Sequence, residues 1–176
     1  MKLRTALVAT VAAVALVAAP AIAAAPAQAA PQTSQGTTLI SFKKEYAGIA
    51  KLIKPMKPAK YIGSKLTFPI DGVDGDVIMH TGGIMVGELM AMDPNITINV
   101  PKKTAKIYFD VNGQETLLFT AKHYKEKAAG SDGVVWQGDL RLTNDKTVVA
   151  ALNAALGVDS LTPGLGLGQI RSTIRN

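Results

Sequence analysis

The feature that most constrains this chain is an alternation of apolar and polar residues in two neighbouring stretches, 95–100 and 106–111. In "NITINV" (95–100) isoleucine and valine alternate with threonine and asparagine, and the same period recurs in "KIYFDV" (106–111). Successive side chains of a β-strand point to opposite faces, so this pattern predicts strands that bury one face of an antiparallel sheet. An α-helix would instead scatter the same apolar residues around its circumference.

Turn signals separate these strands from further apolar runs. Asn112-Gly113 follows the second strand and favours a two-residue hairpin loop, because both residues tolerate positive φ. Short strands at intervals of about ten residues indicate a sandwich or a barrel. We therefore predict a mainly β fold, a single antiparallel β-sandwich or barrel-like domain with one or two short helices. Further strands are expected at "KLTFPI", "DVIMH", "IMVGELM", "TLLFTAKHY" and "VVWQGDLRL".

The sequence "TNDKTVVAALNAALG" (143–157) predicts a helix. Thr143 or Asn144 is expected as the N-cap, Asp145 lies in the first turn, and Gly157 ends the helix. It should pack across an open end of the sheet through the face formed by Val149, Leu152 and Leu156. The following "GLGLG" (164–168) lacks the spacing of a nucleotide-binding loop and predicts a tight return into a final edge strand.

An earlier segment, "LISFKKEYAGIAKLIK" (39–54), allows two interpretations. From Phe42 to Ile53 its apolar residues recur at intervals of three and four, which predicts an amphipathic helix ended by Pro55. A strand followed by a short helix is the competing interpretation, because the apolar residues of the opening "LISF" suit either structure.

The N-terminus follows the plan of a secretory signal peptide. Lys2 and Arg4 precede an apolar run over 6–19, and an A-x-A cleavage motif lies at 27–29. We expect residues 1–29 to be the signal peptide of a secreted, extracellular protein. We expect residues 30–38 to form a flexible arm and residues 39–176 the β-rich domain. An uncleaved anchor is the alternative, disfavoured by prolines at 20 and 26.

The charge is moderately positive and spread along the chain. The formal net charge is +6, and the lysines do not form one arginine-rich patch with interleaved aromatic residues. That distribution argues against nucleic acid as a partner. Once the signal peptide is cleaved, we expect no stable membrane span. Attraction to anionic cell-wall polymers or lipid surfaces remains open.

The inventory of catalytic groups is small. The chain has two histidines, no cysteine and no G-x-S-x-G motif. His80 or His123 could pair with Ser131, Ser160 or a carboxylate, but no spacing favours such a pair. We therefore predict that the protein is not an enzyme, with an extracellular hydrolase as the weaker alternative.

His80 stands at the end of the alternating run "DVIMH" and shares a face with Ile78. If that face is the core face, His80 is at least partly buried. A buried imidazole either satisfies itself by hydrogen bonding or belongs to a ligand site. Gly82 and Gly83, which follow, would permit a sharp turn or the close approach of a ligand.

Several stretches resemble the HtaA-type domain of bacterial secreted and cell-envelope proteins. They are "LTFPIDG", "HTGG", "MDPNITI" and "KIYFDVNG", and later "LTNDKTVVAALNAALGVDSLTPGLGLG". They cover most of the chain after the leader, in order and spacing. The resemblance implies a β-rich fold with short helices. In some members it also implies haem held by a tyrosine that a histidine supports.

The resemblance further implies which residues would hold haem. Tyr46 in "FKKEY" corresponds to the iron ligand, and His80, beside Gly82 and Gly83, to the supporting histidine. A phenolate suits ferric iron, and a nearby imidazole can take the phenol's proton. We accordingly expect a secreted, non-enzymatic binding module for haem. The alternative is an extracellular domain that binds a protein or a cell-wall polymer and no small molecule, with His80 structural.

Overall fold

The computed structural model describes residues 35–128 and 133–175. It confirms the predicted mainly β fold, with two α-helices and one short 3-10 helix in the described residues. The strands are β1 (Gln35–Phe42), β2 (Ile53–Met56), β3 (Lys60–Ile62), β4 (Lys65–Asp74), β5 (Val77–His80), β6 (Gly83–Val86), β7 (Leu89–Asn99), β8 (Thr104–Val111), β9 (Gln114–Ala128), β10 (Val134–Leu142) and β11 (Gly166–Arg175).

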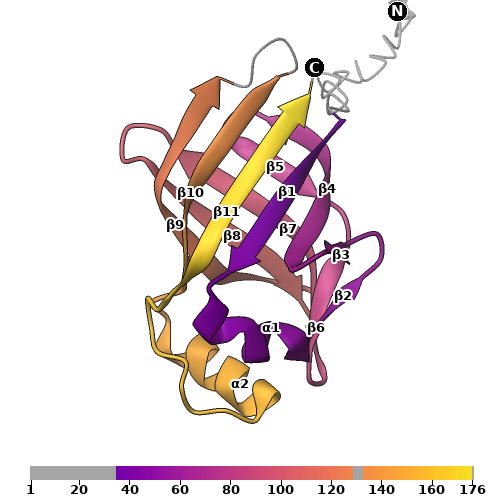
Figure 1. Cartoon of the computed structure of the whole chain (residues 1–176), viewed down its shortest axis with the longest axis vertical. Coiled ribbons are helices and arrows are strands. Elements are labelled where there is room, and N and C mark those ends of the chain that lie inside the picture. Colours follow the sequence, from indigo (N-terminus) through magenta and orange to yellow (C-terminus); the bar gives the residue numbers. More distant parts are fainter. Residues whose placement is uncertain (1–34, 129–132, 176) are drawn as a thin grey trace, which may run out of the picture. The chain divides into compact units, whose positions relative to one another are not determined.

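Eight of the strands close into an antiparallel barrel (Figure 1). Their order is β7-β5-β4-β1-β11-β10-β9-β8, and pairing of β8 with β7 completes the ring. β6 and β2 extend the sheet from the first part of β7, and β3 pairs with β4. Closure leaves no free strand edge in the barrel wall, which removes a common route to edge-to-edge aggregation.

The alternation read from the sequence gives the barrel its core. Ile96, Ile98 and Ile107 point inward and are buried, while Thr97 between them is exposed. The turn from β8 to β9 is made by Asn112 and Gly113, with φ of 56° and 80°. The predicted hairpin is therefore confirmed, in the conformation that both residues tolerate.

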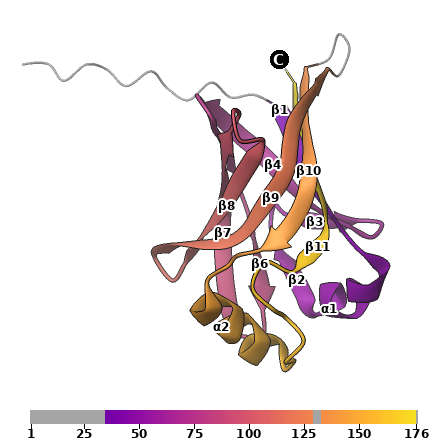
Figure 2. The same ribbon diagram turned by 90° about the vertical axis from the view of Figure 1, so that its left-hand side faces the viewer.

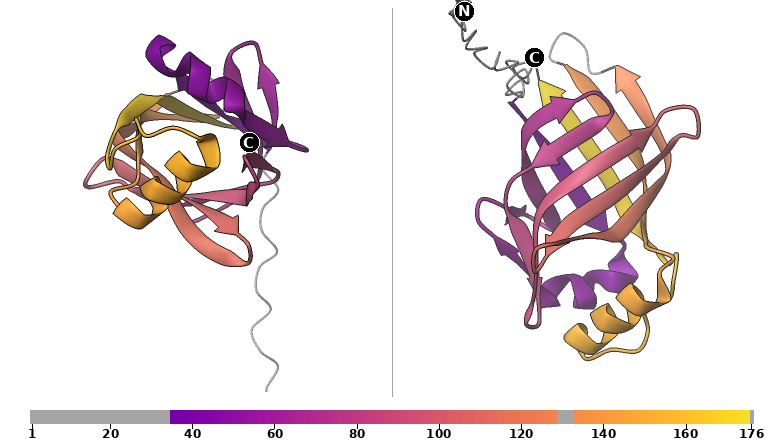
Figure 3. Two further views of the ribbon diagram at one scale, coloured as in Figure 1. Left: turned by 90° about the horizontal axis from the view of Figure 1, so that it is seen from below. Right: turned by 180° about the vertical axis from the view of Figure 1, so that it is seen from behind.

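The helices lie at one end of the barrel, which we call the base (Figures 2 and 3). α2 (Lys146–Leu156) confirms the predicted helix and buries Val149 and Leu152. Its N-cap is Asp145, which accepts hydrogen bonds from the backbone of Thr147 and Val148 at 2.8 and 3.3 Å. The expectation of Thr143 or Asn144 as the cap was off by one or two residues. Gly157 ends the helix with φ of 66°, as predicted.

The first segment is a strand followed by a short helix, so the single long helix was the wrong interpretation. β1 continues to Phe42, a 3-10 turn η1 covers Lys44–Tyr46, and α1 covers only Ala47–Leu52. β1 pairs with both β4 and β11. Backbone hydrogen bonds on two sides outweigh the helical spacing, which the local sequence alone could not reveal.

Two further expectations need correction. β1 begins at Gln35, so the last four residues of the expected arm (30–38) belong to the barrel. The rest of that arm and the expected signal peptide (1–29) lie outside the described residues. β11 is not an edge strand, because it pairs with β1 on one side and β10 on the other. Within 35–128 and 133–175 the helices are all too short or too polar to cross a bilayer.

Candidate ligand-binding site

His80 lies inside the barrel, where a chain of hydrogen bonds holds both of its ring nitrogens. Its Nδ1 is 2.7 Å from the carbonyl oxygen of Pro94, and its Nε2 is 2.6 Å from Oγ1 of Thr38. Thr38 Oγ1 is also 2.8 Å from Oγ of Ser172, and the hydroxyl of Tyr124 is 2.8 Å from the same Ser172 oxygen. We call Thr38, His80, Ser172 and Tyr124 the relay.

The chemistry of these groups fixes the direction of every hydrogen bond in the relay. The carbonyl of Pro94 can only accept, so Nδ1 of His80 carries the proton. In the neutral ring Nε2 is then an acceptor, and the hydroxyl of Thr38 donates to it. Thr38 in turn accepts from Ser172, and Ser172 accepts from Tyr124. Each buried polar group is satisfied with His80 in a single tautomer.

Burial keeps the relay uncharged at neutral pH. Desolvation lowers the pKa of His80 to about 4, and hydrogen bonds to backbone oppose it only in part. Burial also raises the pKa of Tyr124, against a smaller opposing contribution from Ser172. The relay is therefore a set of neutral donors and acceptors that ties β1, β5, β9 and β11 together.

The space beside Gly82 and Gly83 is filled by the chain itself. A Cβ on Gly82 would stand 2.6 Å from the backbone nitrogen of Ala59, and the φ of Gly82 is 90°. A Cβ on Gly83 would collide with the carbonyl oxygen of Ala91. Of the two uses left open by the sequence, the structure supports a sharp turn and close backbone packing. It gives no support to Gly82 and Gly83 as ligand contacts.

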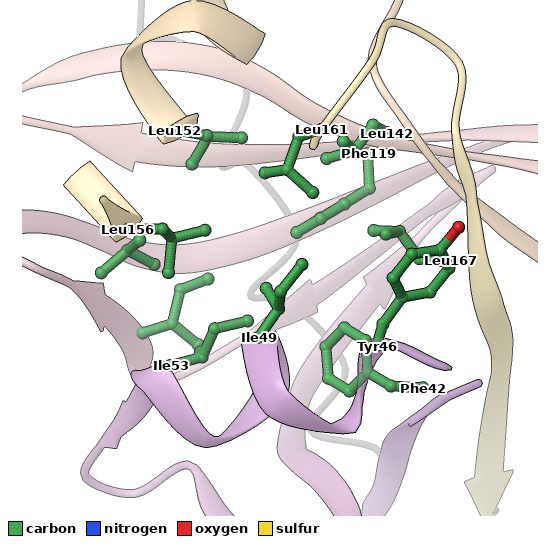
Figure 4. A pocket seen from close by; sticks show the side chains of 12 residues that line it. Phe42, Tyr46, Ile49, Ile53, Phe119, Leu142, Leu152, Leu156, Leu161 and Leu167 are labelled. Carbon is green, nitrogen blue, oxygen red and sulfur yellow. The ribbon is translucent and has the colours of Figure 1, made fainter. Parts of the chain in front are cut away.

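Tyr46 lies at the base, at the end of η1, and is half-buried. It helps to line a small apolar cavity of about 30 Å³ between the barrel and the two helices, which we call the base cavity. Figure 4 shows its ring beside Phe42, with the hydroxyl pointing away from the centre of the cluster. The other lining residues are Ile49, Ile53, Ile84, Val86, Phe119, Leu142, Leu152, Leu156, Leu161 and Leu167.

The structure does not bring Tyr46 and His80 together. Tyr46 lines the base cavity, whereas His80 lines a separate small cavity in the barrel core with Thr38 and Phe68 among its neighbours. Both nitrogens of His80 are already engaged. The expected pair, in which His80 accepts the proton of Tyr46, is therefore not formed. The alternation predicted that His80 shares a face with Ile78, and that face is the core face, but the pattern carried no information on the partners of His80.

An open cleft of about 560 Å³ lies on the other side of α1. On one side of this segment Tyr46, Ile49 and Ile53 face the base cavity. On the other side Ala47, Ala50 and Lys51 face the cleft. Phe42 lines both spaces. The remaining cleft residues are Tyr61, Gly63 and Ser64.

Tyr61 ties the cleft wall to α1. Its hydroxyl donates to the carbonyl oxygen of Ala50 at 2.7 Å, and burial raises its pKa. The cleft therefore combines two aromatic rings, small apolar side chains and one ammonium group. That composition, at a volume within the usual range of ligand sites, suits a flat apolar molecule with an acidic group.

No family model matches the chain, and neither does any curated protein. Solved structures share its fold, among them two from Corynebacterium glutamicum. The haem-binding protein HtaB from Corynebacterium glutamicum aligns with a TM-score of 0.60 at 14% identity, over 82% of this chain and 94% of that one. The C-terminal domain of HtaA from the same organism aligns with a TM-score of 0.58 at 14% identity, over 82% of this chain and 98% of that one.

The chain has an HtaA-type fold.

Within this HtaA-type fold, sequence reasoning missed most of the residues that surround the cleft and the relay. Tyr61 and Ser64 come from a segment with no recognised motif, and the helical spacing of 39–54 assigned no role to Lys51. Thr38 and Ser172 have no local signal that links them to His80. The second histidine, His123, is exposed and 2.7 Å from a carboxylate oxygen of Asp139. The described residues hold no cluster of three or more histidine, aspartate or glutamate side chains placed to hold a metal ion.

Proposed function

We propose that the protein is a non-enzymatic binding module for haem. The observation that carries the proposal is the fold, which the haem-binding protein HtaB shares over 94% of its own length. The cleft beside α1 supplies what the closed barrel interior lacks, a space of about 560 Å³ that opens to solvent.

The cleft suits the two chemical halves of haem. Phe42, Ala47 and Ala50 present aromatic and methyl surface, against which an apolar macrocycle buries area. Lys51 is exposed at the same wall and offers an ammonium group to a carboxylate. In our proposal the ring lies against the first group and its acidic substituents meet the second.

We assign the iron ligand to Tyr46 and not to Tyr61. Iron ligation by tyrosine uses the phenolate, which supplies a hard anionic oxygen to the ferric ion. The hydroxyl of Tyr61 donates a hydrogen bond to the carbonyl oxygen of Ala50, and burial raises the pKa of Tyr61. Both effects oppose formation of the phenolate. Tyr46 lines the base cavity and not the cleft, but its ring lies beside Phe42, which lines both, and its hydroxyl has no hydrogen-bond partner in 35–128 or 133–175. In our proposal its side chain turns toward the cleft when haem binds.

His80 takes no part in this proposed site. Its role is to satisfy the relay inside the barrel. This differs from the Tyr46/His80 pair that the family resemblance implied, and the two versions predict different variant behaviour.

The test is a titration of the purified protein with ferric haem, followed by visible absorption. Saturation at one haem per chain is expected, and Tyr46→Phe should weaken binding by about a hundredfold or more, a loss of roughly 3 kcal/mol. Tyr61→Phe is the matched control, because it removes a phenol that lines the cleft and should change affinity by less than about threefold. A greater loss with Tyr61→Phe would contradict the assignment, and the absence of saturable binding would contradict the proposed function.

Variants of the two histidines test whether His80 takes part in haem binding. His123→Ala, at the exposed histidine, should leave the haem spectrum unchanged, as should any folded variant of His80. A spectrum that responds to His80 while thermal unfolding does not would restore the Tyr46/His80 pair.

We also propose that the protein is secreted, from the charged, apolar and small-residue order of residues 1–29. N-terminal sequencing of protein recovered from the medium should begin at Ala30. Retention in the cell with an intact N-terminus would contradict this.

A further inference from the structure

The outer face of β9, β10, β11 and β1 is strongly positive. These four strands are neighbours in the barrel (Figure 1). Strand pairing aligns Lys125, Gln137 and Arg171 in one row, and Lys122 and Asp139 in the next. The cations on outward positions of this face are Lys122, Lys125, Lys127, Arg141, Arg171 and Arg175.

The exposed carboxylates on these strands are Glu115 at the start of β9, Glu126 and Asp139, of which Asp139 lies within the two rows of cations and is paired. One of its oxygens lies 2.7 Å from Nδ1 of His123. His123 reaches this position because β9 bulges there, with a φ of 52° at His123 and with Gly138 opposite. A Cβ on Gly138 would stand 2.8 Å from the Cα of Tyr124, so the bulge requires glycine.

Two cations of this region meet over Gly166. A Cβ built on Gly166 would lie 3.6 Å from Nζ of Lys43 and 4.0 Å from Nη2 of Arg141. Glu45 lies 3.6 Å from Lys43, but both side chains are exposed and such pairs are weak. Arg141 has no carboxylate within 4.0 Å in the described residues. The missing side chain of Gly166 therefore leaves a cradle between an ammonium and a guanidinium group.

The cradle adjoins a groove of about 370 Å³. Lys43 lines the groove together with Ser41, Gln169 and Asp139, and with Phe42 and Gly168. The hydroxyl and amide groups are hydrogen-bond donors of the kind that accompany anion or sugar recognition. Apart from Phe42 in the groove, the outward positions of the four strands carry no aromatic ring in the described residues, so a row of rings on which successive bases could stack is missing.

We propose that this face binds a linear polyanion without bases, and that one of its phosphate or carboxylate groups lies over Gly166 between Lys43 and Arg141. A bidentate guanidinium and an ammonium group are the common protein partners of both anions. The rows of cations on β9 and β11 then meet further anionic groups along the polymer. The haem proposal does not rest on this face: the groove and the cleft beside α1 share only Phe42, and none of the cations on the four strands lines the cleft.

The test measures binding of polyphosphate, of polygalacturonate and of single-stranded DNA as a function of salt. The double variant Lys43→Gln/Arg141→Gln should weaken binding of the preferred polymer about tenfold and reduce the slope of log affinity against log salt by about 1.4, the effect of two released counterions. Comparison of polyphosphate with polygalacturonate identifies the anionic group.

The control is Lys54→Gln/Lys102→Gln, which removes the same charge from β2 and from the turn between β7 and β8, outside this face. It should change affinity less than about twofold. Equal losses in the two double variants would show that only net charge matters and would overturn the proposal. Tighter binding to DNA than to both other polymers, or no binding to any, would also overturn it.

Gly166→Ala tests the cradle without changing charge. Its new methyl group meets only the two cations, at ordinary contact distances, so the fold should be retained. It occupies the position assigned to the anion and should weaken polymer binding about threefold or more. Unchanged binding in this variant, with an unchanged melting temperature, would overturn the cradle even if Arg141→Gln failed to fold.

Discussion

The relay region and the base of the barrel are both buried, but they are held together in different ways. In the relay, Thr38, His80 and Ser172 are at most 3% exposed and satisfy one another through directed hydrogen bonds. At the base, α1 is six residues long, none of them fully buried, and it closes the barrel through apolar contacts and one side-chain hydrogen bond, from Tyr61 to Ala50. This difference indicates that the barrel interior is a rigid scaffold. A ligand is expected at the base, where fewer buried residues close the barrel.

The largest expected difference is in the cost of truncating side chains in the two regions. Phe68 packs edge-on against His80 and Phe109, with ring centroids 6.4 and 6.0 Å away. Phe68→Ala should lower the free energy of unfolding by about 4 kcal/mol, whereas Ile49→Ala on α1 should lower it by about 1 kcal/mol. Urea unfolding at neutral pH measures both. Equal losses of unfolding free energy in the two variants would contradict the proposed difference between the relay region and the base.

The second difference is in pH dependence. The pKa of His80 is lowered to about 4 from its ordinary 6.5, so the unfolded chain binds the proton first as pH falls. The stabilising contribution is fully present above pH 6.5 and is lost between pH 6.5 and 4, by about 3 kcal/mol. Unfolding free energies at pH 7 and 4.5 should therefore differ less in His80→Gln than in the wild type.

His123→Gln is the matched control for that measurement, since it removes the exposed histidine and leaves the relay intact. If His80→Gln and the wild type lost the same stability on acidification, the neutral buried state of His80 would be contradicted.

A smaller effect sharpens the account of the relay. Thr38→Val preserves shape but removes the hydroxyl that donates to His80 and accepts from Ser172. Leaving these groups unpaired should cost about 2 kcal/mol of unfolding free energy. Thr97→Val, at an exposed strand position, is the control and should change stability by no more than about 0.5 kcal/mol. Similar losses of unfolding free energy in the two variants would show that the hydrogen bonds of the relay do not stabilise the fold.

The parts of this fold that the sequence predicts are those that local chemistry decides. Asn112-Gly113 permits the positive φ of a hairpin, and Gly157 permits the left-handed end of α2. The alternation puts His80 on the same face as Ile78, which the structure shows to be the core face. Each of these outcomes depends on a few neighbouring residues, so a short window of sequence contains the information.

The parts that escape prediction depend on residues far apart in the chain. Thr38 and Ser172, which hydrogen-bond to each other, are 134 positions apart. No spacing could show that Tyr46 and His80 lie in different cavities, because their separation is set by the path of α1 and β4 around the barrel. The end of β1 at Phe42 was ambiguous for the same reason, since the pairing partners that extend it lie elsewhere in the sequence.

The most direct test of the central claim is a crystal structure of the protein with ferric haem. The account predicts the macrocycle in the cleft beside α1, in contact with Phe42, with the phenolate oxygen of Tyr46 as the iron ligand. His80 should keep its hydrogen bonds to Thr38 and Pro94. Haem held by His80 or His123, or bound away from α1, would contradict the assignment of the ligand site to the base of the barrel.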